Sequence, residues 1–471
     1  MKIAFLNPQG NFDRTDAYLT EHPDFGGQLV YVKEVALALG RMGIAVDIIT
    51  RRIRDPEWHG FEEDLDDFGE LADRVRIVRL PCGGDGFLPK EALWPHLPDM
   101  AAAIVDFYRA EPPDFLTAHY ADGGYLAALL KPRLGLGFTF TGHSLGAQKL
   151  DKLLQATGQD FETLDQRYRF SQRIAAERLA MAAASTVITS TTEERMGQYG
   201  HPLYAGAIDP GDDRRFRVIP PGINTRIFHQ DASADEASLL DRFGAAVRQP
   251  ERPHVVVSSR LDPKKNVAGV VEAFCCSPAL SGRAGLALFV RGVDDPWNDI
   301  GQLRADEQAV LGPILERIKQ AGLEDRVSFI NAGSQHELAL AYRMFAATGS
   351  VFALPSLFEP FGLAPIEAAA CGLAVVATRN GGPSEIFAGG AGLLMNPEDP
   401  TDMAQTLVAG LAQAPQLAQA GIERVLSTYT WDKTAAAYLD QIKADLAAGV
   451  TAGPEAVQPL DAAARIRAYL G

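Results

Sequence analysis

Glu359-Pro360-Phe361-Gly362-Leu363-Ala364-Pro365-Ile366-Glu367 sets two carboxylates eight positions apart around a Pro-Phe-Gly turn. The apolar run 349–354 before it predicts a buried strand, and the alanine-rich run 367–371, which Gly372 follows, predicts a helix. Glu359 is therefore expected on the loop that leaves a strand, and Glu367 near the start of the next helix. Open α/β sheets bind ligands at this carboxyl edge of their strands, so the pattern predicts an α/β fold with a ligand site here.

Short β-branched runs alternate with helical patterns along the whole chain, which predicts two doubly wound halves with parallel sheets. The expected strands are Ile3–Phe5, Val46–Ile49, Val75–Val78, Leu116–Ala118, Phe138–Phe140, Val187–Thr189, Val218–Ile219, Val255–Ser258, Leu286–Val290, Val327–Ile330, Val351–Leu354 and Val375–Ala377. Turn formers and charges between Pro220 and Pro250 mark the junction. We expect an N-terminal domain over residues 1–235, onto which a helical segment at 430–471 packs back, and a second domain over residues 236–429.

Composition and charge exclude several classes of protein. A chain of 471 residues is too long for one ordinary core, and 47% hydrophobic with 22% charged residues is typical of soluble globular proteins. The net charge of −16 argues against nucleic acid or an anionic membrane as a partner. No apolar run is long enough to predict a membrane span. The four cysteines lack metal-ligand spacing, so we expect reduced, mostly buried thiols and a cytoplasmic protein.

Two loops of the first half carry small residues directly after a predicted strand. Gly26 and Gly27, with Gln28, open a helix after the loop Pro8–Phe25, and their backbone N–H groups could contact an anion or a sugar. An ordinary glycine-rich turn is the alternative reading. His143 lies in the run 140–146, also at the carboxyl end of a strand. A lone histidine is more often structural, but this position favours contact with a ligand.

Cationic side chains follow predicted strands in both halves. Arg260 and Lys265 come just after a strand and before a helix expected to begin near Asn266, which suits a diphosphate. A basic loop on an acidic protein is the alternative. In the first half, each lysine or arginine taken alone is a solvated surface residue. We hypothesise that several of them converge on the phosphate of an acceptor sugar, the set being Lys90, Tyr120, Ser144, Lys149 and Arg173.

The paired glutamates, together with the downstream run 381–385, resemble the E-x7-E motif of family 4 retaining glycosyltransferases. That family has the GT-B fold, in which two Rossmann-like domains face a central cleft. Three longer runs, 7–12, 22–34 and 142–149, resemble the bacterial sucrose-phosphate synthases within it, and the resemblance covers about residues 1–445. It implies transfer of glucose from UDP-glucose to fructose 6-phosphate with retention, giving sucrose 6-phosphate and UDP.

The same resemblance implies a role for each candidate residue. The implied catalytic residues are His143, Arg260, Lys265 and Glu359. The implied donor-binding residues are Gly26, Gly27, Arg260, Lys265, Glu359, Phe361, Gly362, Leu363 and Glu367. The implied acceptor-binding residues are Gly27, Gln28, Lys90, Tyr120, Ser144, Lys149 and Arg173. Because the cations would neutralise the leaving diphosphate, no metal site and no required cofactor are expected, with Mg²⁺ at most stimulatory.

Three alternative functions stay open. Mannosylfructose-phosphate synthase would use GDP-mannose with the same acceptor, and the sequence does not separate the two sugars. Sucrose synthase would use unphosphorylated fructose, against which the cations of the first half speak. A catalytically inactive sugar-nucleotide sensor would bind the donor without releasing UDP. One local departure, Leu363–Ile366 in place of the Leu-Thr-type continuation of many relatives, affects the turn expected near the ribose.

Overall fold

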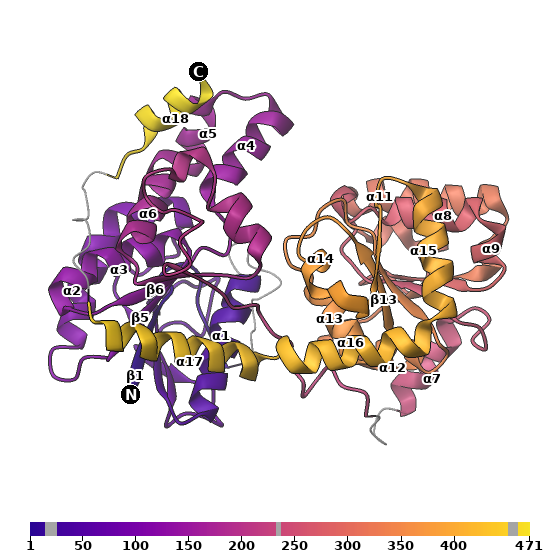
Figure 1. The fold of residues 1–471 in the computed structure, drawn as a ribbon, viewed down its shortest axis with the longest axis horizontal. Coiled ribbons are helices and arrows are strands. Elements are labelled where there is room, and N and C mark those ends of the chain that lie inside the picture. Colours follow the sequence, from indigo (N-terminus) through magenta and orange to yellow (C-terminus); the bar gives the residue numbers. More distant parts are fainter. Residues whose placement is uncertain (15–25, 232–236, 451–459) are drawn as a thin grey trace. The chain divides into compact units, whose positions relative to one another are not determined.

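A computed structural model describes residues 1–14, 26–231, 237–450 and 460–471, which fall into two α/β units (Figure 1). The first unit comprises Met1–Pro221 and Trp431–Gly471, and the second comprises Gly222–Thr430. Residues 222–231 belong to the second unit, although the sequence placed the boundary at residue 235. The reason is local: Ile223 forms a β-bridge with Thr430 and is buried in the second unit's core.

The first unit is built on an eight-stranded sheet in the order β3-β4-β2-β1-β5-β6-β7-β8. All of its strand pairs are parallel except β3 with β4. The chain reverses its direction of winding at β1, whose two neighbours are β2 and β5. The strands are β1 (Lys2–Leu6), β2 (Ala45–Arg51), β3 (Leu65–Asp67), β4 (Val75–Leu80), β5 (Phe115–His119), β6 (Phe138–Thr141), β7 (Thr186–Thr189) and β8 (Phe216–Val218).

Helices cover both faces of this sheet. One face packs on α1 and α17 through a core that includes Ile3, Phe5 and Val32, and the other packs on α2, α3, α4 and α6 through Ala4 and Leu6. Neighbouring residues of β1 thus point to opposite faces, as the pleat of a strand requires. The helices are α1 (Gly27–Arg41), α2 (Leu97–Phe107), α3 (Tyr120–Leu134), α4 (Gly146–Thr157), α5 (Phe161–Tyr168), α6 (Phe170–Ala183), α17 (Trp431–Ala448) and α18 (Ala463–Leu470).

The second unit has a six-stranded, entirely parallel sheet in the order β11-β10-β9-β12-β13-β14. This is the strand order of the Rossmann fold, with the reversal of winding between β9 and β12. The four residues of β9 are all buried, as expected for a strand covered on both faces. The strands are β9 (His254–Val257), β10 (Gly285–Phe289), β11 (Val327–Ile330), β12 (Val351–Leu354), β13 (Ala374–Thr378) and β14 (Leu393–Met395).

Two helical layers sandwich the second sheet (Figure 1). Val255 and Val257 face the layer formed by α8, α11 and α15, whereas Val256 faces the layer formed by α7, α12, α13 and α16. The helices are α7 (Ala237–Ala246), α8 (Val267–Cys276), α9 (Pro278–Ser281), α10 (Pro296–Asp299), α11 (Ala305–Ala321), α12 (Gln335–Ala346), α13 (Leu363–Ala370), α14 (Pro383–Ile386), α15 (Pro400–Ala412) and α16 (Ala414–Thr428).

The twelve expected strands are all present, and the two short strands β3 and β14 are additional. All four cysteines are free thiols, but only Cys82 and Cys371 are buried. Cys275 is partly buried and Cys276 is exposed, so the expectation of mostly buried thiols is wrong for Cys276, which lies at the C-terminal end of α8. Within the described ranges, no helix combines the length and apolar character needed to cross a membrane.

Candidate active site

The predicted residues of the second unit lie at the point where its strand order reverses. Arg260 and Lys265 follow β9, and Glu359 follows β12, the strand that pairs directly with β9. The loops after two adjacent parallel strands leave the same edge of the sheet, which is where open α/β folds bind ligands. The expected helix after the basic loop begins at Val267, with Asn266 as its N-cap.

An ion pair joins the two loops. Lys265 Nζ lies 2.6 Å from Oε2 of Glu359, and the Ser356 hydroxyl donates to the same oxygen at 3.0 Å. The Glu359 side chain is only 13% exposed, so these contacts hold it in one position. Arg260 is exposed and is thus available to an anionic ligand.

Two glycines support the backbone of the Glu359 loop. Gly381 forms a β-bridge with Glu359, and a Cβ on Gly381 would lie 2.0 Å from the carbonyl oxygen of Glu359. A Cβ on Gly382 would lie 2.5 Å from the carbonyl oxygen of Phe361. Only glycine permits this approach, and Gly381 also has a φ of +101°. The Gly-Gly pair that sequence analysis noted downstream thus shapes the loop that carries the first glutamate.

The second glutamate lies inside α13. Gly362, with a φ of +107°, precedes the helix, and Leu363 is its first residue and 38% exposed. The first N–H groups of an α-helix have no partner within the helix, so this end suits a phosphate. Burial raises the pKa of the Glu367 carboxyl to about 7. Phe361 is partly buried and its ring contacts Tyr429 edge-on, with the centroids 6.0 Å apart.

Four of the seven predicted acceptor residues line one pocket of the first unit, whereas Gly27, Gln28 and Ser144 are not part of its wall. Lys90 comes from a 3-10 turn (Lys90–Ala92), Tyr120 from the start of α3, Lys149 from α4 and Arg173 from α6. The pocket is narrow, with a cavity volume of about 10 Å³, and the side chains of its two lysines are half-buried. The remaining residues of its wall are Glu91, Trp94, Asp122, Tyr168 and Phe170.

Arg173 is held in place by several contacts. Its guanidinium is buried, donates from Nε to Oε1 of Glu177 at 2.9 Å, and donates from Nη2 to the carbonyl oxygen of Ser144 at 2.6 Å. The guanidinium carbon also lies over the Tyr120 ring, 4.6 Å from its centroid. Ser144 is therefore joined to the pocket through Arg173. Arg173 is a structural residue as well as a candidate ligand, which the sequence did not reveal.

His143 forms a pair with a second histidine. Its backbone has a φ of +56°, and its Nε2 lies 3.0 Å from Nδ1 of His119, the last residue of β5. Burial lowers the pKa of His143 to about 3. Burial, with the charge of His143 second, also holds the pKa of His119 well below its ordinary value. Both rings are therefore neutral near pH 7, and one ring nitrogen donates to the other.

The Gly26–Gly27 pair opens α1 as expected. Apart from their chain neighbours and the helix's own backbone, no described atom lies within 4 Å of a Cβ built on either glycine. Gln28 donates from its side chain to Oδ1 of Asn7 at 2.6 Å, which ties the helix start to the end of β1. In the preceding loop, residues 15–25 lie outside the described residues. They include the first four residues of the run 22–34, on which part of the family resemblance rests.

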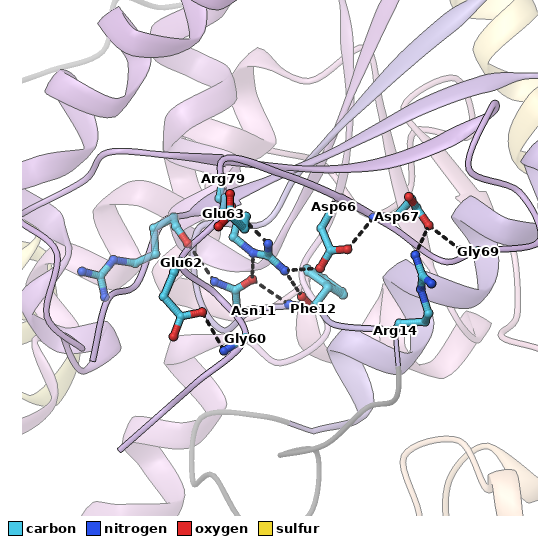
Figure 2. A network of polar contacts seen from close by, with 11 residues as sticks. Asn11, Phe12, Arg14, Gly60, Glu62, Glu63, Asp66, Asp67, Gly69 and Arg79 are labelled. Carbon is cyan, nitrogen blue, oxygen red and sulfur yellow. Dashed lines mark hydrogen bonds and ion pairs between the residues drawn. The ribbon is translucent and has the colours of Figure 1, made fainter. Parts of the chain in front are cut away.

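The described start of that loop is fixed by a buried arginine (Figure 2). Arg79 of β4 donates to Oδ1 of Asn11 at 3.0 Å and to the carbonyl oxygen of Phe12 at 2.7 Å. It also forms an ion pair of 2.9 Å with Asp66 of β3. Arg14 is bound in turn to Asp67 at 2.6 Å. Through Asp66 and Asp67, the short strand β3 thus helps to hold the segment that follows β1.

Sequence reasoning missed two residues of the first unit. The sequence analysis assigned no role to His119 or to Asp122. His119 ends a buried strand, Asp122 comes three residues later, and Gly123 and Gly124 follow. This order of a strand end, polar side chains and small residues is similar to the one that indicated His143. Across the described part of the chain, no cluster of three or more His, Cys, Asp or Glu side chains could hold a metal ion.

Two family models match the two units in turn. The model described as "Glycosyl transferase 4-like domain" matches residues 26–222, and that described as "Glycosyl transferases group 1" matches residues 243–421. A protein of Thermosipho melanesiensis named probable sucrose-phosphate synthase is 42% identical over 445 residues, which cover 94% of this chain and 96% of the relative. The chain belongs to the sucrose-phosphate synthase family.

Other relatives agree with this assignment. Sucrose-phosphate synthase 4 of Arabidopsis thaliana is 33% identical over 94% of this chain, but the chain spans only 47% of that longer plant protein. The solved structure of sucrose-phosphate synthase from Thermosynechococcus elongatus superposes with a TM-score of 0.67 at 26% identity, covering 95% of this chain and 100% of that one. The Anabaena HepE structure in complex with UDP has a TM-score of 0.61 at 17% identity, with coverage of 94% and 100%, which supports the fold alone.

These comparisons confirm the predicted fold class and family. The chain is a glycosyltransferase with two Rossmann-like units of the GT-B class. Hexosyl transfer is the activity that membership of this family implies.

Proposed function

We propose that this member of the sucrose-phosphate synthase family transfers glucose from UDP-glucose to fructose 6-phosphate, with retention at the anomeric carbon. The products are sucrose 6-phosphate and UDP. The observation that carries the proposal is the gathering of Lys90, Lys149 and Arg173 in one pocket of a chain whose net charge is −16. A cationic pocket on an acidic protein favours a phosphorylated acceptor over a neutral sugar.

The second unit is proposed to bind the donor. Arg260 and Lys265 would neutralise the diphosphate, together with the backbone N–H of Leu363 at the start of α13. Glu359, held by Lys265 and Ser356, would accept hydrogen bonds from hydroxyls of the glucosyl ring. Glu367 would accept hydrogen bonds from the ribose hydroxyls. Nothing in this assignment requires a cofactor, because the two cations supply the positive charge that a metal would otherwise supply.

A same-face displacement fits these residues better than a double displacement. A double displacement needs a carboxylate nucleophile at the anomeric carbon, whereas Glu359 is engaged with Lys265 and Ser356. In the same-face path the acceptor hydroxyl attacks as the diphosphate leaves, and the leaving phosphate takes the proton. Arg260 and Lys265 stabilise the negative charge that grows on UDP. His143, being neutral, would stabilise the oxocarbenium-like state as a hydrogen-bonding dipole rather than as a cation.

A donor and acceptor panel with product identification tests the proposal. UDP-glucose, ADP-glucose and GDP-mannose are each mixed with fructose 6-phosphate and with fructose, UDP release is followed, and the product is identified by NMR. Sucrose 6-phosphate with an α-configured glucosyl group is the expected product. Faster turnover with GDP-mannose would reassign the donor, and faster turnover with fructose would reassign the acceptor. Donor binding without nucleotide release would identify a sensor.

The four free cysteines favour a reducing compartment, so we place the reaction in the cytoplasm.

A further inference from the structure

Asp122 is a buried carboxyl group to which the function proposed above gives no role. It lies in the first turn of α3, is 2% exposed, and borders the same pocket as Lys90, Lys149 and Arg173. Its Oδ1 accepts a hydrogen bond from the backbone N–H of Gly123 at 2.8 Å. Its Oδ2 is buried and has no hydrogen-bond partner among the described residues. Because buried polar atoms are almost always paired, Oδ2 points to a ligand group as its partner.

The Asp122 carboxyl can be either ionised or protonated near neutral pH. Burial raises the pKa of Asp122 to about 7, although backbone hydrogen bonds and the charge of Arg173 act to lower it. Near neutral pH both forms are therefore present. The two forms differ in what they can bind, since a carboxylate only accepts hydrogen bonds and a carboxylic acid also donates one.

The charges around the pocket decide which form suits a phosphate. The groups that line it beside Asp122 are Lys90 and Glu91 of the 3-10 turn, Tyr120 of α3, Lys149 of α4, Tyr168 of α5 and Arg173 of α6. The charge of Arg173 is already balanced by the fully buried Glu177. An ionised Asp122 would repel a phosphate dianion at this place, whereas the protonated carboxyl would donate a hydrogen bond to it.

We propose that Asp122 is a further binding residue for the phosphorylated acceptor, and that it binds as the carboxylic acid, with Oδ2–H donating to a phosphate oxygen. The inference rests on the proposed acceptor site. Its consequence is that acceptor binding takes up a proton from solvent. The free enzyme loses this proton as the pH rises above about 7 while the complex keeps it, so acceptor affinity falls by up to about tenfold per pH unit above that value.

Calorimetric titration of the full-length protein with fructose 6-phosphate tests this directly. Titrations in buffers of different ionisation enthalpy give the number of protons taken up. We expect the wild type to take up about half a proton more than Asp122→Asn at pH 7, and nearly one more at pH 8.5. Asp122→Asn keeps a neutral donor in place and should bind the acceptor with little change in affinity between these pH values. Glu91→Gln, which removes another carboxylate of the same pocket, is the matched control and should keep the pH dependence of the wild type.

Three results would overturn the inference. One is equal proton uptake by the wild type and Asp122→Asn. The second is a folded Asp122→Asn variant, checked by thermal melting, that no longer binds the acceptor at any pH. The third needs no variant: above pH 7.5 the phosphate itself is already a dianion, since its second pKa is about 6, so wild-type binding without net proton uptake contradicts the proposal.

A parallel titration with inorganic phosphate separates this inference from the proposed function. Phosphate binding with Asp122-dependent proton uptake, but no binding of fructose 6-phosphate, would reject the acceptor and keep the role of Asp122. Binding of both ligands without Asp122-dependent proton uptake would keep the proposed acceptor and reject the role of Asp122. Binding of neither ligand would reject both.

Discussion

Lys265 Nζ lies 2.6 Å from Oε2 of Glu359, so a side chain that follows β9 is bound to one that follows β12. The pair lies at the point where the strand order of the sheet reverses. A carboxylate proposed to bind a sugar and a cation proposed to bind a diphosphate are thereby held at a fixed separation before either ligand arrives. Such preorganisation lowers the cost of ordering the site when the donor binds.

Arg260→Ala is expected to lower kcat by about 100-fold or more, because the proposed partner of Arg260 gains charge in the transition state. Its side chain is exposed, so the thermal midpoint should stay unchanged. Steady-state kinetics with UDP-glucose and fructose 6-phosphate measure the effect. Arg283→Ala, at another exposed arginine of the same unit, is the control. A kcat equal to that of the wild type would remove Arg260 from the mechanism.

Lys149→Ala is expected to raise the KM for fructose 6-phosphate about tenfold or more while leaving the KM for UDP-glucose nearly unchanged. Lys149 borders the acceptor pocket, whereas Lys152 of the same helix is exposed and is not part of the pocket wall. Lys152→Ala therefore serves as the matched control and should alter neither constant. Equal increases in both KM values for Lys149→Ala would argue against the acceptor assignment.

Arg173→Met is expected to destabilise the fold as well as weaken acceptor binding. The substitution leaves Glu177, which is fully buried, without its charge partner at 2.9 Å. Breaking one side of a buried pair costs about 3–5 kcal/mol. Urea denaturation compares Arg173→Met with the double variant Arg173→Met/Glu177→Gln, which should regain part of the lost stability. A single variant as stable as the wild type would show that the pair contributes nothing.

Glu367 is expected to make UDP binding stronger as the pH rises through about 7. Burial raises the pKa of its carboxyl to about 7, and the ionised form is the better acceptor for two ribose hydroxyls. The folded-state pKa is above the ordinary value, so ionisation costs stability in the free protein, and bound UDP offsets that cost. Calorimetry at pH 5.5 and 7.5 should show affinity about tenfold greater at the higher pH. In Glu367→Gln this difference should shrink markedly, and its persistence would exclude the ribose role.

Gly381→Ala is expected to reduce both stability and activity. A Cβ at this position would lie 2.0 Å from the Glu359 carbonyl oxygen, and the φ of +101° is itself unfavourable for alanine. The expected loss exceeds about 1 kcal/mol, with a fall in kcat because the Glu359 loop must shift. Gly312→Ala, inside α11 with open space around it, should instead add about 0.5–1 kcal/mol. Thermal melts and initial rates of the two variants give the comparison.

Much of the fold was readable because the buried strands are continuous apolar runs. Val351–Leu354 has the expected bounds, and the strand expected at Val255–Ser258 is found one residue earlier, at His254–Val257. β3 and β14 were not predicted, because a segment of three residues is too short to show a clear pattern. The Leu-Asp-Asp sequence of β3 also carries two charges, which are uncommon in strands. Asp66 of β3 forms an ion pair with Arg79 of β4, a tertiary contact that no local pattern indicates.

The sequence predicted which residues belong to the candidate site, but not the contacts that these residues make with one another. The sequence placed Glu359, Lys265 and Arg260 at strand ends, and the structure adds that the first two form an ion pair. Asp122 is harder to read from sequence, because an acidic residue in the first turn of a helix is favoured by the helix dipole and usually needs no other explanation. Its burial and unpaired oxygen, which depend on tertiary packing, are what distinguish it.

The first unit is interrupted in the sequence by the second, and α17 completes its core. Trp431, Tyr438 and Ile442 pack with Ile3 and Phe5 in one apolar cluster. A ribosome makes residues 222–430 before it makes α17, so the half of the protein synthesised first is the last to be finished. One face of β1 therefore stays incompletely covered while the second unit is translated. Domains usually mature in N-to-C order, and here the first unit is completed after the second. Newly made chains stalled before residue 431 should therefore be preferred clients of chaperones.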